Sequence, residues 1–209
     1  MAGTATFGDL VVKQTLTFQP RWNDQGSGAD RDGAFWHPVP QDIFRPLGSV
    51  VVAGYGDING QRASLLVSYN ASKVGPKGPA VKEPTDYQLM WADNGSGAKQ
   101  DGSIWRPVAP AGYVAVGDVA ASGYNKPDLT QVWCLRADLA LAGGFWAGSV
   151  WDDRGSGADM DGSFWEVLAS VPARTADAIP ALAGTFVSNQ GYGQPAATIA
   201  RVPGLSLLS

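Results

Sequence analysis

The sequence predicts an all-β fold made of three related lobes, and two observations lead to this prediction. A fifteen-residue phrase, W-x-D-x-G-S-G-A-x-x-D-G-x-x-W, occurs three times, at residues 22–36, 91–105 and 151–165. A repeat this close means that one supersecondary unit is used three times. Elsewhere, short β-branched and aromatic runs alternate with Gly, Pro, Asn and Asp, and no window of eleven or more residues shows a helical apolar stripe.

The expected strands are short and bounded by turn residues. In chain order they are 10–18, 49–53, 63–69, 87–91, 113–119, 130–135, 150–151 and 164–168. In the second copy, the strand YQLMW enters the Gly-rich phrase and SIWRPV leaves it, and PAGYVAVGDV and LTQVWCLRADL supply two further strands. Each unit therefore offers about four strands.

Further residues recur at similar distances after the second tryptophan of each phrase. They are Gly48, Gly117 and Gly184, then the pairs Gly54-Tyr55, Gly123-Tyr124 and Gly191-Tyr192, with Pro127 and Pro195 in matching positions. The phrases begin 69 and then 60 residues apart, which is too long for a trefoil barrel. We expect three four-stranded sheets around a pseudo-threefold axis, a β-prism-like fold, in a single domain 1–209 with repeats at about 1–70, 71–139 and 140–209.

Composition and charge limit the classes of function. The formal net charge is −4 and no cluster of Lys and Arg would neutralise a run of phosphates, so we expect no nucleic-acid partner. Cys134 is the only cysteine, so no intramolecular disulfide can form. The N-terminus shows no secretory signal, and 178–200 is too polar to span a membrane. We expect a soluble protein, cytoplasmic or released by a non-classical route, with its oligomeric state left open.

Several stretches together carry a resemblance to a known family. GDLVVKQTLTFQPRW, FWHPV, PAGYVAVGDV and KPDLTQVWCLRADL resemble the vacuolar protein sorting-associated protein 62 family of fungi and plants. The resemblance is strong in the middle unit and weaker after Ala173, where ATIARV replaces the VWCLR strand; the first unit has Pro46-Leu47-Gly48-Ser49 where GYVAVGD would be. It implies a β-rich fold similar to the β-prisms found beside membrane-associated and pore-forming proteins, and no catalytic mechanism.

The repeated phrase has a purely structural interpretation. Gly26, Gly28 and Gly33, with their counterparts, allow the positive φ of a tight reversal between two strands. The aspartate two residues after each first tryptophan can accept hydrogen bonds from the amides of the Gly-Ser-Gly-Ala turn and hold the loop closed. The flanking tryptophans can bury large areas at the seam between lobes.

The alternative interpretation is a binding site in each loop. Carboxylates, backbone amides and a tryptophan face are the groups that bind a sugar, and three copies would add avidity on a glycan or glycolipid surface. The candidate ligand-binding residues are Trp22, Asp24, Gly26, Ser27, Gly28, Asp32, Trp91, Asp93, Gly95, Ser96, Gly97, Asp101, Trp151, Asp153, Gly155, Ser156, Gly157 and Asp161. This interpretation predicts a non-catalytic, lectin-like recognition module without a cofactor, for which peripheral membrane contact is an open option.

Calcium is a third option for the phrase, in copies one and three only. Asp24, Asp30 and Asp32 cluster in the first copy, and hard carboxylate oxygens at such density suit Ca²⁺. The middle copy has Lys99 where the others have aspartate, and the remainder of a calcium-loop pattern is missing. We therefore predict no metal site shared by the three copies.

An enzyme is not expected. The only histidine, His37, has no repeated partner, and the sequence around Ser27 lacks the spacing of a nucleophile elbow. Asp24 and Asp32 would serve as a glycosidase pair only in one asymmetric site, whereas this phrase is copied three times. Cys134, in the apolar run VWCLR, is most simply a buried small residue.

Two other non-catalytic roles remain open from the sequence. One is a membrane-active, toxin-like protein, in which 139–150 and 179–200 become mobile and amphipathic on oligomerisation, although loops of the prism explain these stretches more simply. The other is a protein-interaction module in vacuolar trafficking, which the family resemblance suggests.

Overall fold

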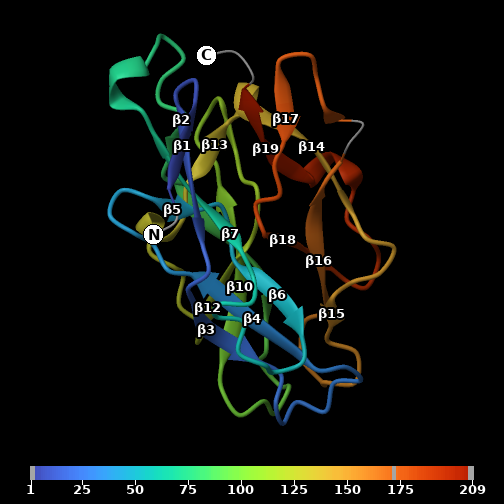
Figure 1. The fold of residues 1–209 in the computed structure, drawn as a ribbon. Coiled ribbons are helices and arrows are strands. Elements are labelled where there is room, and N and C mark those ends of the chain that lie inside the picture. Colours follow the sequence, from blue (N-terminus) through green and yellow to red (C-terminus); the bar gives the residue numbers. More distant parts are fainter. Residues whose placement is uncertain (1–2, 171–172, 207–209) are drawn as a thin grey trace.

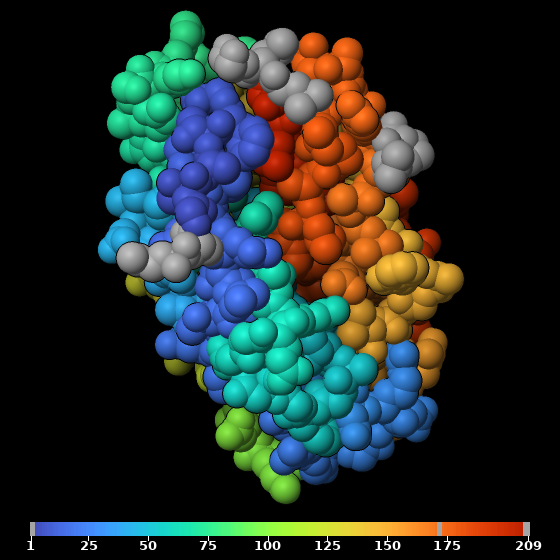
Figure 2. Space-filling model, in the orientation of Figure 1, coloured from blue at the N-terminus to red at the C-terminus, as the bar shows by residue number. Residues whose placement is uncertain are grey.

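The computed structural model describes residues 3–170 and 173–206, which form an all-β protein (Figure 1). The described helices are single 3₁₀ turns: η1 (Ala71–Lys73), η2 (Leu129–Gln131), η3 (Ala137–Leu139) and η5 (Ala197–Ile199). Within the described ranges, no helix has the length and hydropathy needed to cross a membrane. Figure 2 shows that the N-terminal third and the C-terminal third of the chain pack side by side along the molecule.

Each copy of the repeat builds a three-stranded antiparallel arrangement around its Gly-rich phrase, with the strand that leaves the phrase in the centre. In copy one it is β3 (Phe18–Asn23), β4 (Gly33–Pro38) and β6 (Val50–Ala53). In copy two it is β9 (Asp86–Ala92), β10 (Gly102–Val108) and β12 (Val119–Ser122). In copy three it is β15 (Trp151–Asp152), β16 (Gly162–Ala169) and β18 (Phe186–Gln190).

Each copy also contributes strands to a second arrangement farther from the phrases. Copy one supplies β2 (Leu10–Thr15), β7 (Ser64–Tyr69) and β5 (Arg45–Pro46), with β1 (Thr4–Phe7) at the edge. Copy two supplies β8 (Val81–Lys82), β13 (Cys134–Arg136) and β11 (Tyr113–Val114). Copy three supplies β14 (Ala140–Phe145), β19 (Arg201–Ser206) and β17 (Ala178–Pro180).

The sheet count differs from the expected three sheets of four strands. The described residues form five sheets, of four, three, three, six and three strands. In copies one and two the strands of the two arrangements belong to separate sheets. In copy three, β14 pairs with both β16 and β19, which joins the two arrangements into one six-stranded sheet.

The first tryptophans of the three phrases form the centre of the main core. The rings of Trp22, Trp91 and Trp151 lie edge-on to one another, with centroids 5.1, 5.3 and 5.6 Å apart. Phe35 and Phe164 pack against them. Rings in this geometry stabilise a core beyond the area that they bury. The centre of the protein therefore belongs to all three copies, and each copy adds a smaller buried cluster of its own.

The glycines that recur after each phrase mark a second close contact between copies. A Cβ at Gly48 would lie 2.8 Å from the Cα of Gly117, and a Cβ at Gly117 would lie 2.6 Å from the Cβ of Thr185. Only a residue without a side chain allows the backbones to approach this closely. The recurrence of Gly48 and Gly117 in the sequence therefore has a packing reason.

The second tryptophans reveal one unsatisfied donor. Trp105 Nε1 donates to Ser103 Oγ (2.8 Å) and Trp165 Nε1 donates to Ser163 Oγ (3.0 Å). In copy one, the residue in the matching position is Ala34, and the buried Trp36 Nε1 has no hydrogen-bond partner. A buried N–H without a partner costs about 1–3 kcal/mol.

We therefore predict that Ala34→Ser stabilises the protein. The new hydroxyl would accept from Trp36 Nε1 and donate to the carbonyl of Gly54, as Ser103 Oγ donates to the carbonyl of Gly123 (2.6 Å). We expect a gain of about 1 kcal/mol in the free energy of unfolding, measured by urea denaturation. In a Trp36→Phe background, which lacks the N–H, the same substitution should give a clearly smaller gain; an equal gain in both backgrounds would contradict the explanation.

Candidate functional site

The three Gly-rich loops, residues 23–32, 92–101 and 152–161, have the same internal hydrogen bonds. In the first, Gly33 N donates to Asp24 Oδ1 (2.9 Å), Ser27 N donates to the Asp24 carbonyl (2.9 Å), and Ala29 N donates to Ser27 Oγ (3.2 Å). Asp93 and Asp153 accept from Gly102 N (3.1 Å) and Gly162 N (3.0 Å) in the same way. The aspartate thus closes each loop as expected, but its partner is the glycine after the loop and not an amide of the turn.

Each loop is also bonded to the next copy, and these bonds close into a ring. Lys99 N donates to the carbonyl of Gln25, Asp159 N to that of Asn94, and Asp30 N to that of Arg154, each at 2.8 Å. Glycines at positive φ make these approaches possible: φ is 93° at Gly26 and 79° at Gly28. The three loops therefore form one continuous end of the molecule, called the loop end below.

The indole of each first tryptophan reaches into the neighbouring loop. Trp22 Nε1 donates to the carbonyl of Gln100 (2.7 Å), Trp91 Nε1 to that of Met160 (2.9 Å), and Trp151 Nε1 to that of Arg31 (2.7 Å). Trp22 and Trp91 also donate to the loop carboxylates of Asp93 (2.9 Å) and Asp153 (2.8 Å). Burial raises the pKa of Asp153, although Gly162 N–H and Trp91 favour its charged form.

These contacts contradict part of the predicted binding site. Trp22, Trp91 and Trp151 are 2%, 1% and 0% exposed, and Trp36, Trp105 and Trp165 are buried as well, so none of the six rings offers a stacking face. The carboxylates of Asp24, Asp93 and Asp153 and the hydroxyls of Ser27, Ser96 and Ser156 are buried and used inside the loops. The indoles of Trp22 and Trp91 and the carboxylates of Asp93 and Asp153 satisfy one another across the copies, which leaves these groups little capacity for a ligand.

The exposed members of the predicted set remain on the surface of the loop end. They are Gly26, Gly28, Asp32, Gly95, Gly97, Asp101, Gly155, Gly157 and Asp161. Each of these aspartates accepts a hydrogen bond from a tyrosine of its own copy: Tyr55 to Asp32 (2.9 Å), Tyr124 to Asp101 (3.2 Å) and Tyr192 to Asp161 (2.9 Å). These three contacts are called the Tyr–Asp pairs.

The Tyr–Asp pairs combine an aromatic ring with an exposed carboxylate. Burial of the hydroxyl, and then hydrogen bonding to Asp24 and Asp32, raise the pKa of Tyr55, so its hydroxyl stays protonated. Tyr124 is 41% exposed. The third pair differs, because the Arg154 guanidinium lies 4.3 Å from the centre of the Tyr192 ring and covers one face. The Gly-Tyr pairs were visible as repeats in the sequence, but nothing in their spacing showed that the tyrosines return to the loops.

The structure also places the remaining candidates of the sequence analysis. Within the described ranges, no group of three or more His, Cys, Asp or Glu side chains is placed to hold a metal ion. Cys134 is buried in β13, and burial raises its thiol pKa to about 12, so it is not a thiolate at neutral pH. Asp24 is buried, so an Asp24–Asp32 glycosidase pair has no access to substrate.

The two stretches that the toxin-like interpretation expects to become mobile contain strands of the sheets. Residues 139–150 contain β14, whose first half pairs with β19 and whose second half pairs with β16. Residues 179–200 contain β18 and η5. Beside β14, Trp146 is 60% exposed, and Gln194 Nε2 donates to its carbonyl (2.9 Å).

The comparisons with known proteins agree with this architecture. The model of the vacuolar protein sorting-associated protein 62 family matches residues 1–205. The chain belongs to this family. No curated protein matches it. The crystal structure of GNIP1Aa from Chromobacterium piscinae is similar, with a TM-score of 0.73 and 25% sequence identity over 92% of this chain and 35% of that chain. This member of the vacuolar protein sorting-associated protein 62 family thus spans about a third of the length of GNIP1Aa.

His37 has a structural role that makes stability depend on pH. It is buried between copies one and two, where Nδ1 accepts from Ser49 Oγ (2.8 Å) and Nε2–H donates to the carbonyl of Gln131 (3.2 Å). Burial, and then the charge of Arg21, lower its pKa from 6.5 to about 3. At a pH between about 3 and 6.5, the His37 imidazole binds a proton in the unfolded chain but not in the folded protein. The contribution of His37 to stability is therefore complete above pH 6.5 and falls as the pH is lowered.

We predict that His37→Gln reduces the loss of stability in acid. Between pH 7 and pH 5 the wild type should lose about 2 kcal/mol more unfolding free energy than the variant, because each pH unit below 6.5 costs about 1.4 kcal/mol for one such group. Urea denaturation at both pH values measures the difference. Parallel pH profiles for the two proteins would show that His37 is not protonated on unfolding.

Proposed function

We propose that this protein is a non-catalytic recognition module that binds carbohydrate or glycolipid surfaces through the Tyr–Asp pairs of the loop end. The observation that supports the proposal is the recurrence, in every copy, of a tyrosine beside an exposed carboxylate at the same place relative to the loop; Tyr124 is exposed, and Tyr55 and Tyr192 are half-buried. A sugar presents an apolar face beside hydroxyls, and a tyrosine ring beside a carboxylate matches both features.

The arrangement of the pairs favours a ligand that is itself repeated. The ring of bonds between the loops fixes the three pairs relative to one another, so that simultaneous contacts require little ordering of the protein. Three weak sites on one rigid end bind a dense glycan surface much more strongly than a free sugar. The Arg154 that covers Tyr192 adds a positive charge to the third pair only, which suits an acidic sugar there.

The β-prism-like architecture is part of the same proposal. We infer that the two arrangements of strands in each copy form one lobe, and that three lobes surround the line through the tryptophan centre. The ring of loop contacts and the shared tryptophan core support this interpretation. Such an architecture places the three pairs on a common face.

We predict that replacing Asp32, Asp101 and Asp161 together by Asn weakens glycan binding by about a hundredfold, because three sites lose their charged acceptor at once and avidity multiplies the losses. Single substitutions should each cost only a few-fold. Binding to a glycan array, followed by surface plasmon resonance on the best glycan, gives both numbers. Asp177→Asn, an exposed aspartate outside the loops, is the matched control.

Four outcomes would count against the proposal. One is a wild-type protein that binds no glycan or glycolipid, and another is a triple variant that binds as well as the wild type with an unchanged melting temperature. Leakage of vesicles without glycolipid would favour the membrane-active alternative. Recovery of a protein partner that the triple variant still binds would favour an interaction module in trafficking.

A further inference from the structure

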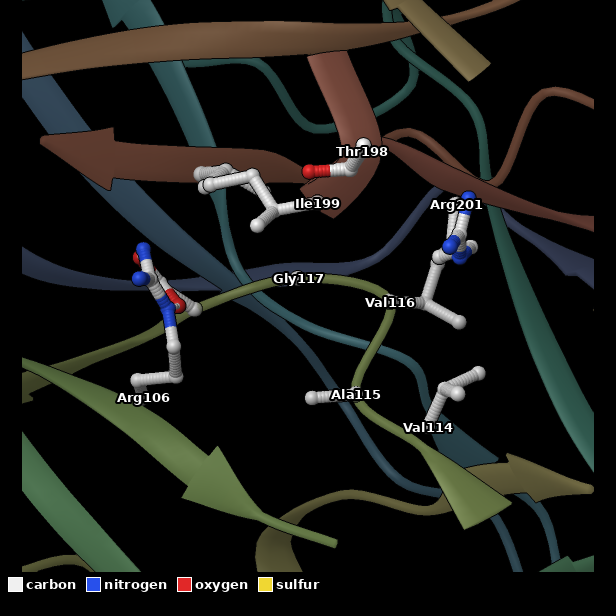
Figure 3. A pocket seen from close by; sticks show the side chains of 10 residues that line it. Arg106, Val114, Ala115, Val116, Gly117, Thr198, Ile199 and Arg201 are labelled. Carbon is white, nitrogen blue, oxygen red and sulfur yellow. Dashed lines mark hydrogen bonds and ion pairs between the residues drawn. The ribbon is translucent and has the colours of Figure 1, made fainter. Parts of the chain in front are cut away.

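A cavity of about 270 Å³ lies between copies two and three, away from the loop end (Figure 3). The chain from Val114 to Gly117 forms one edge, and η5 with the start of β19 forms the opposite edge. Figure 3 shows Arg106 and Arg201 on opposite sides of the cavity, with Thr198 and Ile199 along the edge between them. The cavity is called the junction pocket below.

The matching places between the other copies are closed by hydrogen bonds. Between copies one and two, Trp133 N donates to the carbonyl of Pro46 (3.0 Å), and Arg45 Nε donates to that of Thr130 (2.9 Å). Between copies three and one, Leu65 N and Ser64 Oγ both donate to the carbonyl of Ala183 (3.1 and 2.8 Å). Cavities also lie at these two junctions, one of about 270 Å³ beside Arg21 and one of about 450 Å³ beside Arg62 and Glu166, but Pro46 and Ala183 are not among the residues that line them.

The residue responsible for the opening is Arg201. Counted from the matching prolines Pro127 and Pro195, Arg201 occupies the position that Trp133 has in copy two. Trp133 fills its junction, and its indole donates to the carbonyl of Ile43 (3.3 Å). Arg201 instead places a cation beside an unfilled space.

The charges of the pocket do not balance. Arg106 donates to both carboxylate oxygens of Asp118 (2.9 Å each) and to the carbonyl of Ser188 (2.6 Å), so its charge is neutralised inside the protein. In the described part of the chain, the Arg201 side chain makes no hydrogen bond or ion pair, and the Thr198 hydroxyl makes no hydrogen bond. Among the described residues, Asp118 is the only acidic side chain that lines the pocket. One cation and one hydroxyl therefore remain for a ligand.

We propose that the junction pocket binds an oxyanion attached to a short apolar body, of the kind found in phosphate monoesters. The Arg201 guanidinium presents parallel N–H donors that match two oxygens of a phosphate, and the Thr198 hydroxyl adds a third donor. Val114 and Ile199 supply apolar surface for the attached carbon chain. Such a group occurs both in soluble esters and in the head group of phosphatidic acid, and the pocket recognises the chemistry that the two share.

Titration calorimetry on the full chain tests the proposal with butyl phosphate and inorganic phosphate. Butyl phosphate should bind saturably and more tightly than inorganic phosphate, because only the ester contacts the apolar walls. Arg201→Gln should weaken binding about tenfold or more, since it removes charge-assisted hydrogen bonds. It should leave the melting temperature unchanged, because the Arg201 side chain has no partner in the protein.

A second variant and a control separate the pocket from general charge effects. Ala115→Leu fills the pocket without changing the net charge and should also abolish binding. Arg174→Gln removes an exposed arginine that does not line the pocket and should bind like the wild type.

Vesicles distinguish the two sources of the group. Arg201-dependent binding to phosphatidylcholine vesicles that contain phosphatidic acid, but not to pure phosphatidylcholine vesicles, assigns the head group; binding of butyl phosphate without vesicle binding assigns a soluble ester. The proposal is overturned if the wild type binds neither probe, or if Arg201→Gln and Ala115→Leu bind like the wild type. None of these outcomes depends on whether the Tyr–Asp pairs bind glycans.

Discussion

The hydrogen bond from each first tryptophan to the next copy is the constraint on which the structure depends. An indole N–H buried at the centre of the molecule must find an acceptor, and each of the three finds a carbonyl in a neighbouring loop and not in its own. Losing such a partner leaves a buried donor unsatisfied, at a cost of about 1–3 kcal/mol. Because the bonds run from copy one to two, two to three and three to one, all three indoles are satisfied only when all three copies are present.

The same constraint explains why the most repeated residues are poor candidates for a ligand site. Asp93 holds Gly102 N with one oxygen and Trp22 Nε1 with the other, and Asp153 does the same for Gly162 and Trp91. A carboxylate with both oxygens engaged in a buried site has little left to offer a sugar. The phrase is therefore repeated because each copy closes the ring of hydrogen bonds between the loops. The residues that we propose for recognition, the Tyr–Asp pairs, contact this ring from outside.

The sequence predicted the features that depend on local pattern. The short strands, the glycine reversals and the family follow from residues close together in the chain. The five sheets differ from the expected three because the sheet count depends on whether one strand pairs in both arrangements, which β14 does in copy three and no single strand does in the described parts of copies one and two. The Tyr–Asp pairs and the partners of the indoles were not predictable, because they join residues 23 to 120 positions apart whose contact only the closed ring creates.

Where the copies differ, the structure departs from threefold equivalence, and these departures are where single-site chemistry can arise. A residue shared by all copies can produce only three similar sites, whereas the change from Trp133 to Arg201 places an arginine without a protein partner at one junction only. Arg154 acts in the same way on a smaller scale, since it covers Tyr192 while Gln25 and Asn94 stand at the matching positions. Both departures place an arginine in or beside copy three. The proposed glycan sites at the loop end and the proposed anion site at the junction therefore use different parts of the repeat. Residues in either place can change without disturbing the tryptophan ring.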